Sequence, residues 1–302
     1  MFSNPFFTKV LSDNQHGSGR VLNQAMESFK TWGSQQTKIE RQKIIDTGQQ
    51  LFKTFPNFAV LFHFLNELLL WTENQPPAVA SQDLINWILN YEKHWSYSRV
   101  KASQNLLKNV PLSRKQILLH SNSSAVQTLF QEIKKKNLSC TIWQTVSSPA
   151  NEGTLQAEFL AGMGFKIHLI HENEIWLFKN HFDLTILGSD LMTGDFFINK
   201  TATRSICLLD LPTYLLSETR KYIDESSLTP KLFSQLTTEP PKPDNELYQG
   251  KKTNIQVHNY YFEKTPLSKV KNIVLENGFF TPQSFKKIFP LQKISNYLTD
   301  SL

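Results

Sequence analysis

The sequence predicts an α/β protein in which a helical first third is followed by a parallel β-sheet. Between Gln116 and Ser217, four short apolar runs each end in small polar residues, and amphipathic segments separate the runs. Strands that alternate with crossover helices form parallel sheets. Ahead of these runs, apolar residues recur at the spacing of helices. The two patterns together define the fold class.

Four helices are predicted in the first third, and prolines separate them. Their apolar faces extend from Val21 to Trp32, Ile39 to Phe52, Leu65 to Leu70 and Ile85 to Trp95. Asp83 is expected to cap the fourth helix. The stretch from Phe58 to Trp71 is the most apolar of the chain, and we expect a buried helix there, because a membrane span needs about 20 apolar residues.

The pattern changes near residues 108–115, so we expect a helical domain over residues 1–110 and a sheet domain over 111–302. In the sheet domain, strands are expected over 117–119, 141–146, 166–170, 184–187 and 214–216. Helices are expected over 125–136 and over 155–163, the latter followed by Gly164. Further extended segments are expected over 254–262 and 270–275. The polar, proline-bearing stretch 226–253 is expected to be a loop or insertion.

Composition narrows the function. The 302 residues carry a net charge of +6, which weakly favours an anionic ligand or partner. Nucleic acid is not an expected partner, because there is no contiguous basic face with interleaved aromatics. Two cysteines without metal-ligand spacing indicate free thiols of a cytoplasmic protein. We expect no metal and no cofactor, since the eight histidines form no ligand motif, and no association with a membrane.

Asp190 is the most interesting acidic residue, because it follows a buried strand and a Gly-Ser turn. Ligands bind beyond the carboxyl ends of parallel strands. Partial burial there would raise the pKa of the carboxyl group and suit it to general acid catalysis. From spacing alone, however, capping of the next turn is the favoured interpretation.

Two other segments could bind a phosphate. Asn199 and Lys200 are expected to precede a helix, whose N-terminus would attract an anion. A second candidate is a turn with two glycines and a cation that is expected to open a helix, formed by Gly17, Ser18, Gly19 and Arg20. Capping by Asn199 and a merely flexible glycine turn are the structural alternatives. A serine hydrolase is excluded, since Ser121 lacks a GxSxG frame.

These segments, taken in order, resemble the alpha, beta and delta subunits of initiation factor two B and two related isomerases, of ribose-1,5-bisphosphate and of methylthioribose-1-phosphate. The matching segments are "HGSGRVLNQAMESF", "ILLHSNSS", "TVSSPANEG", "FDLTILGSDLMTGDFFINKTAT", "LPTYLLSETRKY" and "ENGFFTP". The resemblance implies a helical N-terminal domain on a Rossmann-like parallel-sheet domain, with dimerisation through the latter.

The resemblance also implies roles for individual residues. In the isomerases a cysteine and an aspartate act on a phosphorylated sugar, and these positions fall on Ser121 and Asp190. A phosphate-gripping arginine falls on Ser148, and a glutamine falls on Glu152. The remaining matches to site positions are Asn199, Lys200, Glu218 and Lys221. A serine hydroxyl does not ionise near neutral pH without an activating base, so the loss of the cysteine puts catalysis in doubt.

Three hypotheses follow. The first is a catalytically degenerate or regulatory protein that binds a phosphorylated sugar or nucleotide. The second is an aldose–ketose isomerase that acts on a ribose-1-phosphate-type substrate with another base in place of the thiol. The third is a subunit of a guanine-nucleotide exchange assembly for translation initiation. The expected partners are a phosphorylated small molecule, a second copy of the chain in a homodimer, or related subunits in a hetero-oligomer.

Overall fold

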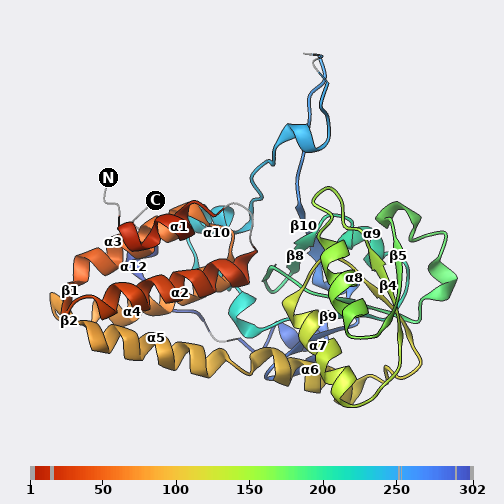
Figure 1. Cartoon of the computed structure of the whole chain (residues 1–302), viewed down its shortest axis with the longest axis horizontal. Helices are drawn as coiled ribbons and strands as arrows, with labels where there is room; N and C mark the ends of the chain where they lie inside the picture. Colours follow the sequence, from red (N-terminus) through yellow and green to blue (C-terminus); the bar gives the residue numbers. More distant parts are fainter. Residues whose placement is uncertain (1–3, 14–16, 251, 253, 290, 300–302) are drawn as a thin grey trace. The chain divides into compact units, whose positions relative to one another are not determined.

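A computed structural model describes residues 4–13, 17–250, 252, 254–289 and 291–299 (Figure 1). The chain forms two compact units, which are described separately. Unit 1 comprises residues 1–97, 223–238 and 290–302, and unit 2 comprises residues 98–222 and 239–289. The chain therefore leaves unit 1 and returns to it twice. The division into domains at residue 110 stays a prediction, whereas the helix that precedes this position belongs to unit 2.

Unit 1 is built mainly of helices. They are α1 (Thr8–Leu11), α2 (Ser18–Ser34), α3 (Arg41–Thr54), α4 (Ala59–Glu73), α5 (Ser81–Trp95), α10 (Pro230–Thr237) and α12 (Asn296–Thr299). Two short antiparallel strands, β1 (Lys38–Glu40) and β2 (Ala78–Ala80), lead into α3 and α5. Edge-on packing of aromatic rings fills the interior, as where the centroids of Phe7 and Phe29 lie 4.6 Å apart. Figure 1 shows α1 to α5 in red to orange, whereas α10 and α12, which come late in the chain, are cyan and blue.

The buried helix expected between Phe58 and Trp71 is confirmed as α4, whose buried side chains include Phe64, Leu65 and Leu68. Among the described residues, no helix is both long and apolar enough to cross a membrane. The cap expected at Asp83 is wrong. Ala80 precedes α5, and Asp83 lies within its first turn. An acidic side chain there still complements the partial positive charge of the helix N-terminus.

Unit 2 has a mostly parallel sheet at its centre. Its strands, in spatial order, are β5 (Lys166–Ile170), β4 (Thr141–Thr145), β3 (Gln116–Leu119), β6 (Leu184–Leu187), β9 (Thr213–Leu216), β11 (Asn272–Leu275) and β12 (Gly278–Phe280). Only β12 runs antiparallel to its neighbour. The sheet grows outward from β3 in one direction and then, from β6, in the other. This is the order of a doubly wound sheet, and the predicted α/β fold class is confirmed.

Both faces of the sheet are buried. Ile117 and Leu119 of β3 pack in one apolar cluster, together with α6 (Ser98–Asn109), α7 (Ser124–Lys135) and α8 (Glu152–Gly162). Leu118 points to the opposite cluster, which includes residues of α9 (Thr203–Cys207) and α11 (Pro282–Phe285). A strand that is covered on both faces carries apolar residues that point to both sides. This explains why the strands of this sheet are mostly continuous apolar runs in the sequence.

A second, smaller sheet lies within unit 2. It joins β10 (Phe262–Pro266), β8 (Phe196–Lys200) and β7 (Leu191–Met192) in antiparallel pairs. The extended segment expected over 254–262 forms a strand only from Phe262 onward, so that expectation is wrong for most of its length. The loop expected over 226–253 is also wrong in part, because it contains α10. The Thr229 hydroxyl caps this helix, and Pro230 begins it.

Candidate functional site

Ser121 and Asp190, two of the predicted site residues, lie at the carboxyl edge of the large sheet, where its strand order reverses between β3 and β6. Ser121 follows β3, and Asp190 follows β6. In open α/β sheets this reversal leaves a crevice in which ligands bind. The topology therefore directs attention to these two strand ends before any side chain is considered.

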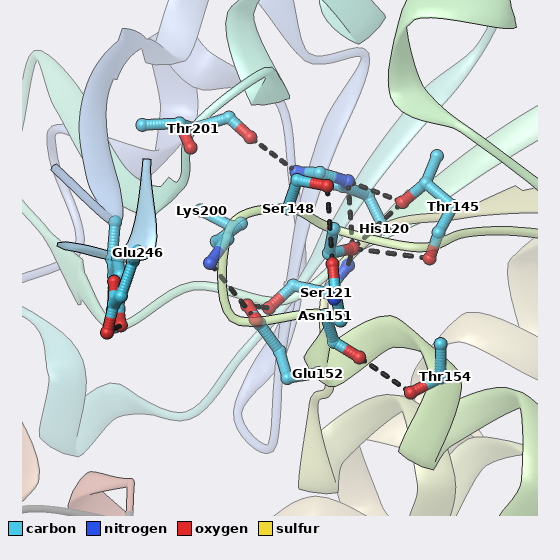
Figure 2. A network of polar contacts seen from close by, with 12 residues as sticks. His120, Ser121, Thr145, Ser148, Asn151, Glu152, Thr154, Lys200, Thr201 and Glu246 are labelled. Carbon is cyan, nitrogen blue, oxygen red and sulfur yellow. Dashed lines mark hydrogen bonds and ion pairs between the residues drawn. The ribbon is translucent and has the colours of Figure 1, made fainter. Parts of the chain in front are cut away.

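Ser121 is held in a left-handed backbone conformation, with φ of +65°. Its amide donates a hydrogen bond of 2.8 Å to the Ser147 hydroxyl, which fixes this unusual turn. Its own hydroxyl donates to Oε1 of Glu152 over 3.1 Å (Figure 2). The side chain expected to correspond to the isomerase cysteine is thus nearly buried and directed at a carboxylate.

Lys200 forms an ion pair with the same carboxylate. Its Nζ lies 3.0 Å from Oε2 of Glu152 and 4.4 Å from the ring centroid of Tyr261. The lysine side chain is fully buried. Although close to Glu152, the ammonium group makes no aligned hydrogen bond with any of the described residues. A buried charge is costly unless it is paired, and the Glu152 carboxylate supplies the opposite charge here.

Behind Ser121, His120 belongs to a buried relay of hydrogen bonds. Nε2 of His120 donates to the carbonyl oxygen of Thr201 at 2.8 Å, so Nδ1 must accept from the Thr145 hydroxyl at 2.6 Å. Thr145 in turn accepts from Ser147, 2.9 Å away, which accepts from the Ser121 amide. Burial lowers the pKa of His120 to about 4, and the neutral ring therefore holds three loops together.

Asp190 is half-buried, and the pKa of its carboxyl group is raised. Burial is the main cause, and the charge of Glu152 adds to it, whereas Lys221 and Lys200 oppose it. Lys221 donates a short hydrogen bond to the carbonyl oxygen of Ser189, the residue before Asp190. An acid whose protonated form is favoured can donate a proton or a hydrogen bond.

Direct contacts thus join Ser121, Glu152 and Lys200, and the charges of Glu152, Lys200 and Lys221 act on Asp190. Every one of these five residues was a candidate from the sequence. Carboxylates, ammonium groups and a hydroxyl at one sheet edge can bind a phosphoryl group and move a proton.

Other candidates have their own partners. Ser148 lies beside Asn151 and His171, with side-chain contacts of 3.3 Å to each. Asn199 donates to the hydroxyl of Thr203 at 2.9 Å, and the capping alternative is wrong, because Ala202 is the N-cap of α9 and no side chain caps this helix. Neither side chain contacts Lys200.

Glu218 is buried and accepts hydrogen bonds of 2.7 Å from Arg220 and Ser98. Burial alone would raise the pKa of Glu218, but the charges of Arg220, Lys221 and Arg99 lower it on balance. Glu218 is therefore the counter-ion of a cationic cluster, and it makes no contact with the Ser121–Glu152–Lys200 group.

The expectation that Asn199 and Lys200 open a helix is wrong. They are the last two residues of β8, and α9 begins only at Thr203. Strand alternation directs their side chains to opposite sides, so Asn199 reaches Thr203 and Lys200 reaches Glu152. The turn formed by Gly17, Ser18, Gly19 and Arg20 does open a helix, α2, but it lies in unit 1.

Sequence reasoning missed Glu172. This buried residue follows β5, and its carboxylate accepts hydrogen bonds from the backbone amides of Ser147 and Ser148 at 3.0 and 2.8 Å. Burial would raise the pKa of Glu172, yet these hydrogen bonds lower it overall. Its position just past the end of an edge strand was the available signal. Across the described ranges, no three His, Cys, Asp or Glu side chains gather as a metal ion would require.

The fold and this site define an α/β protein with a cluster of polar side chains at the carboxyl edge of a doubly wound sheet and with a helical N-terminal part. The chain belongs to the initiation factor 2 subunit family, whose family model matches residues 14–282. The resemblance noted in the sequence is thereby confirmed.

Several relatives are similar over most or part of the chain. The ribose 1,5-bisphosphate isomerase of Methanocaldococcus jannaschii is 22% identical over 290 residues, which are 92% of this chain and 91% of that protein. A putative translation initiation factor eIF-2B subunit 2-like protein of Pyrococcus abyssi is 27% identical over 175 residues, covering 55% of this chain and 58% of the relative.

Solved structures of the family show the same fold. The translation initiation factor eIF-2B of Pyrococcus horikoshii OT3 aligns with a TM-score of 0.73 at 20% identity, over 95% of this chain and 98% of that one. A chain of the tetrameric eIF2B-beta2-delta2 complex of C. thermophilum aligns with a TM-score of 0.71 at 10% identity, over 91% and 92%.

Proposed function

We propose that the protein binds a phosphorylated small molecule, a sugar phosphate or nucleotide, at the Ser121–Glu152–Lys200 group and that it lacks isomerase turnover. The observation that supports this proposal is Lys200, whose ammonium group is fully buried and makes no aligned hydrogen bond within the described part of the chain. A phosphoryl oxygen would supply the missing acceptor, and hydrogen bonds to charged groups are the strong ones. A cytoplasmic location is part of the same proposal.

The loss of turnover is proposed from the environment of Ser121. The Ser121 hydroxyl stays protonated at neutral pH and cannot accept a proton from a substrate as a thiolate would. The carboxylate of Glu152 is too weak a base to ionise this hydroxyl. Without one acid–base partner, proton transfer slows by about 10²–10⁴-fold. The raised pKa of Asp190 would then serve binding, as a donor to a ligand oxygen.

Asp190 also supports the alternative of an active aldose–ketose isomerase, because a protonated acid is what that reaction needs. The similarity of the chain to a ribose 1,5-bisphosphate isomerase also favours an active isomerase. The solved tetrameric complex supports a further alternative, assembly with related subunits. A homodimer stays a proposal. The apolar residues Ile273–Leu275 would not supply an exposed interface for it, because they belong to the buried strand β11.

Calorimetric titration with ribose-1-phosphate, ribose-1,5-bisphosphate and AMP tests the binding proposal. Lys200→Met keeps the aliphatic stem and removes the charge, and we expect it to weaken binding by about 10–100-fold, the value of one charged hydrogen bond. Because this change leaves Glu152 without its counter-ion, the double variant Lys200→Met/Glu152→Gln separates lost binding from lost folding.

Lys264→Met is the matched control. Lys264 also lies on a strand of the small sheet, with its Nζ 5.0 Å from an aromatic centroid, but it is exposed. It should bind like the wild type. Equal affinity of wild type and Lys200→Met would refute the site. Robust isomerase turnover of the wild type that Asp190→Asn abolishes would refute the loss of catalysis and favour the enzyme.

A further inference from the structure

We infer that Glu152 is an internal competitor for Lys200, so that a bound phosphoryl group must displace it and the site selects ligands with one phosphoryl group over bisphosphates. This inference rests on the proposed function, because it names the ligand class of that same site.

The contacts show that Glu152 takes the place where a ligand anion would bind. Its Oε2 lies 3.0 Å from Nζ of Lys200, and its Oε1 accepts from Ser121 at 3.1 Å. These are two carboxylate oxygens on a cation and a hydroxyl, the donors that a phosphoryl group also seeks. A carboxylate and a phosphate cannot both occupy the immediate neighbourhood of one ammonium group without mutual repulsion.

The burial of the two partners decides which one moves. The Lys200 side chain is 0% exposed and is backed by the ring of Tyr261, whereas the Glu152 side chain is 22% exposed. Glu152 is also the first residue of α8, directly after Asn151 with φ of +56°. Its carboxylate can therefore rotate into water and keep its favourable place at a helix N-terminus, while Lys200 stays in position.

The surrounding charges explain the selection. Lys200 and Lys221 supply positive charge near Asp190, but Glu152 opposes it, and the charge of Asp190 acts in turn on a further carboxylate, Glu239. Lys242 pairs with Glu239 at 3.0 Å and is thereby offset. One phosphoryl group can be balanced by the two nearby lysines, whereas a second would meet carboxylates. The displaced Glu152 would in addition accept hydrogen bonds from ligand hydroxyls, as it now does from Ser121.

A titration of three variants with two ligands tests the inference. Wild type, Glu152→Gln and Glu158→Gln are each titrated with ribose-1-phosphate and with ribose-1,5-bisphosphate. Glu158→Gln is the matched control, because Glu158 is exposed on the same helix and the change in net charge is identical. Glu152→Asp is added as a variant that keeps the charge but shortens the reach to Lys200.

We expect Glu152→Gln to bind both ligands more tightly than the wild type. The gain in affinity should be roughly tenfold larger for the bisphosphate than for the monophosphate, because the bisphosphate carries more negative charge and is therefore repelled more strongly by the Glu152 carboxylate. Glu158→Gln should match the wild type, and Glu152→Asp should lie between. Unchanged affinities in Glu152→Gln, with the wild type binding, would overturn this inference and leave the proposed function standing. Absence of binding in every variant would overturn both.

Discussion

Gly153→Ala is expected to destabilise unit 2 and to displace Glu152. A Cβ at Gly153 would lie 2.0 Å from the carbonyl oxygen of Thr145, 2.8 Å from Oγ of Ser147 and 2.9 Å from Nε2 of Gln144. Thr145 is the last residue of β4, which is paired on both sides, so the start of α8 must move by roughly an ångström or more. Overpacking of this kind costs about 1–3 kcal/mol, and contact with backbone places it at the upper end.

Thermal unfolding followed by circular dichroism measures the effect. At about 2–4 °C per kcal/mol for a domain of this size, we expect the melting temperature to fall by roughly 6–12 °C. Gly162→Ala, at the other end of α8, is the control, because nothing lies within 4 Å of its added Cβ. It should be neutral or more stable by up to about 1 kcal/mol. If Gly153→Ala melted within roughly a degree of the wild type, the argument from close approach would be refuted.

Three further predictions concern protonation. Because burial lowers the pKa of His120 from 6.5 to about 4, the folded state gains stability as pH rises from 4 to 6.5, by about 3 kcal/mol in total. His120→Asn should remove this part of the pH dependence of urea unfolding. Asp190 has a raised pKa, so its contribution is present at low pH and is lost as pH rises; Asp190→Asn should therefore gain stability relative to the wild type between pH 4 and pH 8, measured in the same way. Cys140 and Cys207, with pKa raised to about 11 and 12 by burial, should react slowly with a thiol reagent at pH 8 until the protein is unfolded. Fast reaction of either thiol in the folded protein would contradict its burial.

The secondary structure of unit 2 was largely predictable. Short, mostly apolar runs at β3, β4, β6 and β9, separated by amphipathic segments, indicate strands covered on both faces, and the polar residues after them mark their ends. α10 was missed because a single short helix between prolines leaves little periodicity, although Thr229-Pro230 is a recognisable start. The return of the chain to unit 1 depends on tertiary contacts, which no local pattern records.

The candidate site was predicted in part for a similar reason. Strand ends that share one edge bring Ser121 and Asp190 to it, so topology alone predicts both. The link from Glu152 to Lys200 depends on the first residue of α8 and the last of β8, which belong to different elements. The relay through His120 was missed because hydroxyls at Thr145 and Ser147 look like ordinary turn residues until their directions are known.

The hydrogen bond from Ser121 to Glu152 limits how this strand end could be made reactive. A thiol introduced by Ser121→Cys would face the same carboxylate, whose negative charge would raise the pKa of that thiol and keep it unreactive. Glu152→Gln alone would leave only a serine. A reactive thiolate at the end of β3 therefore requires both substitutions together.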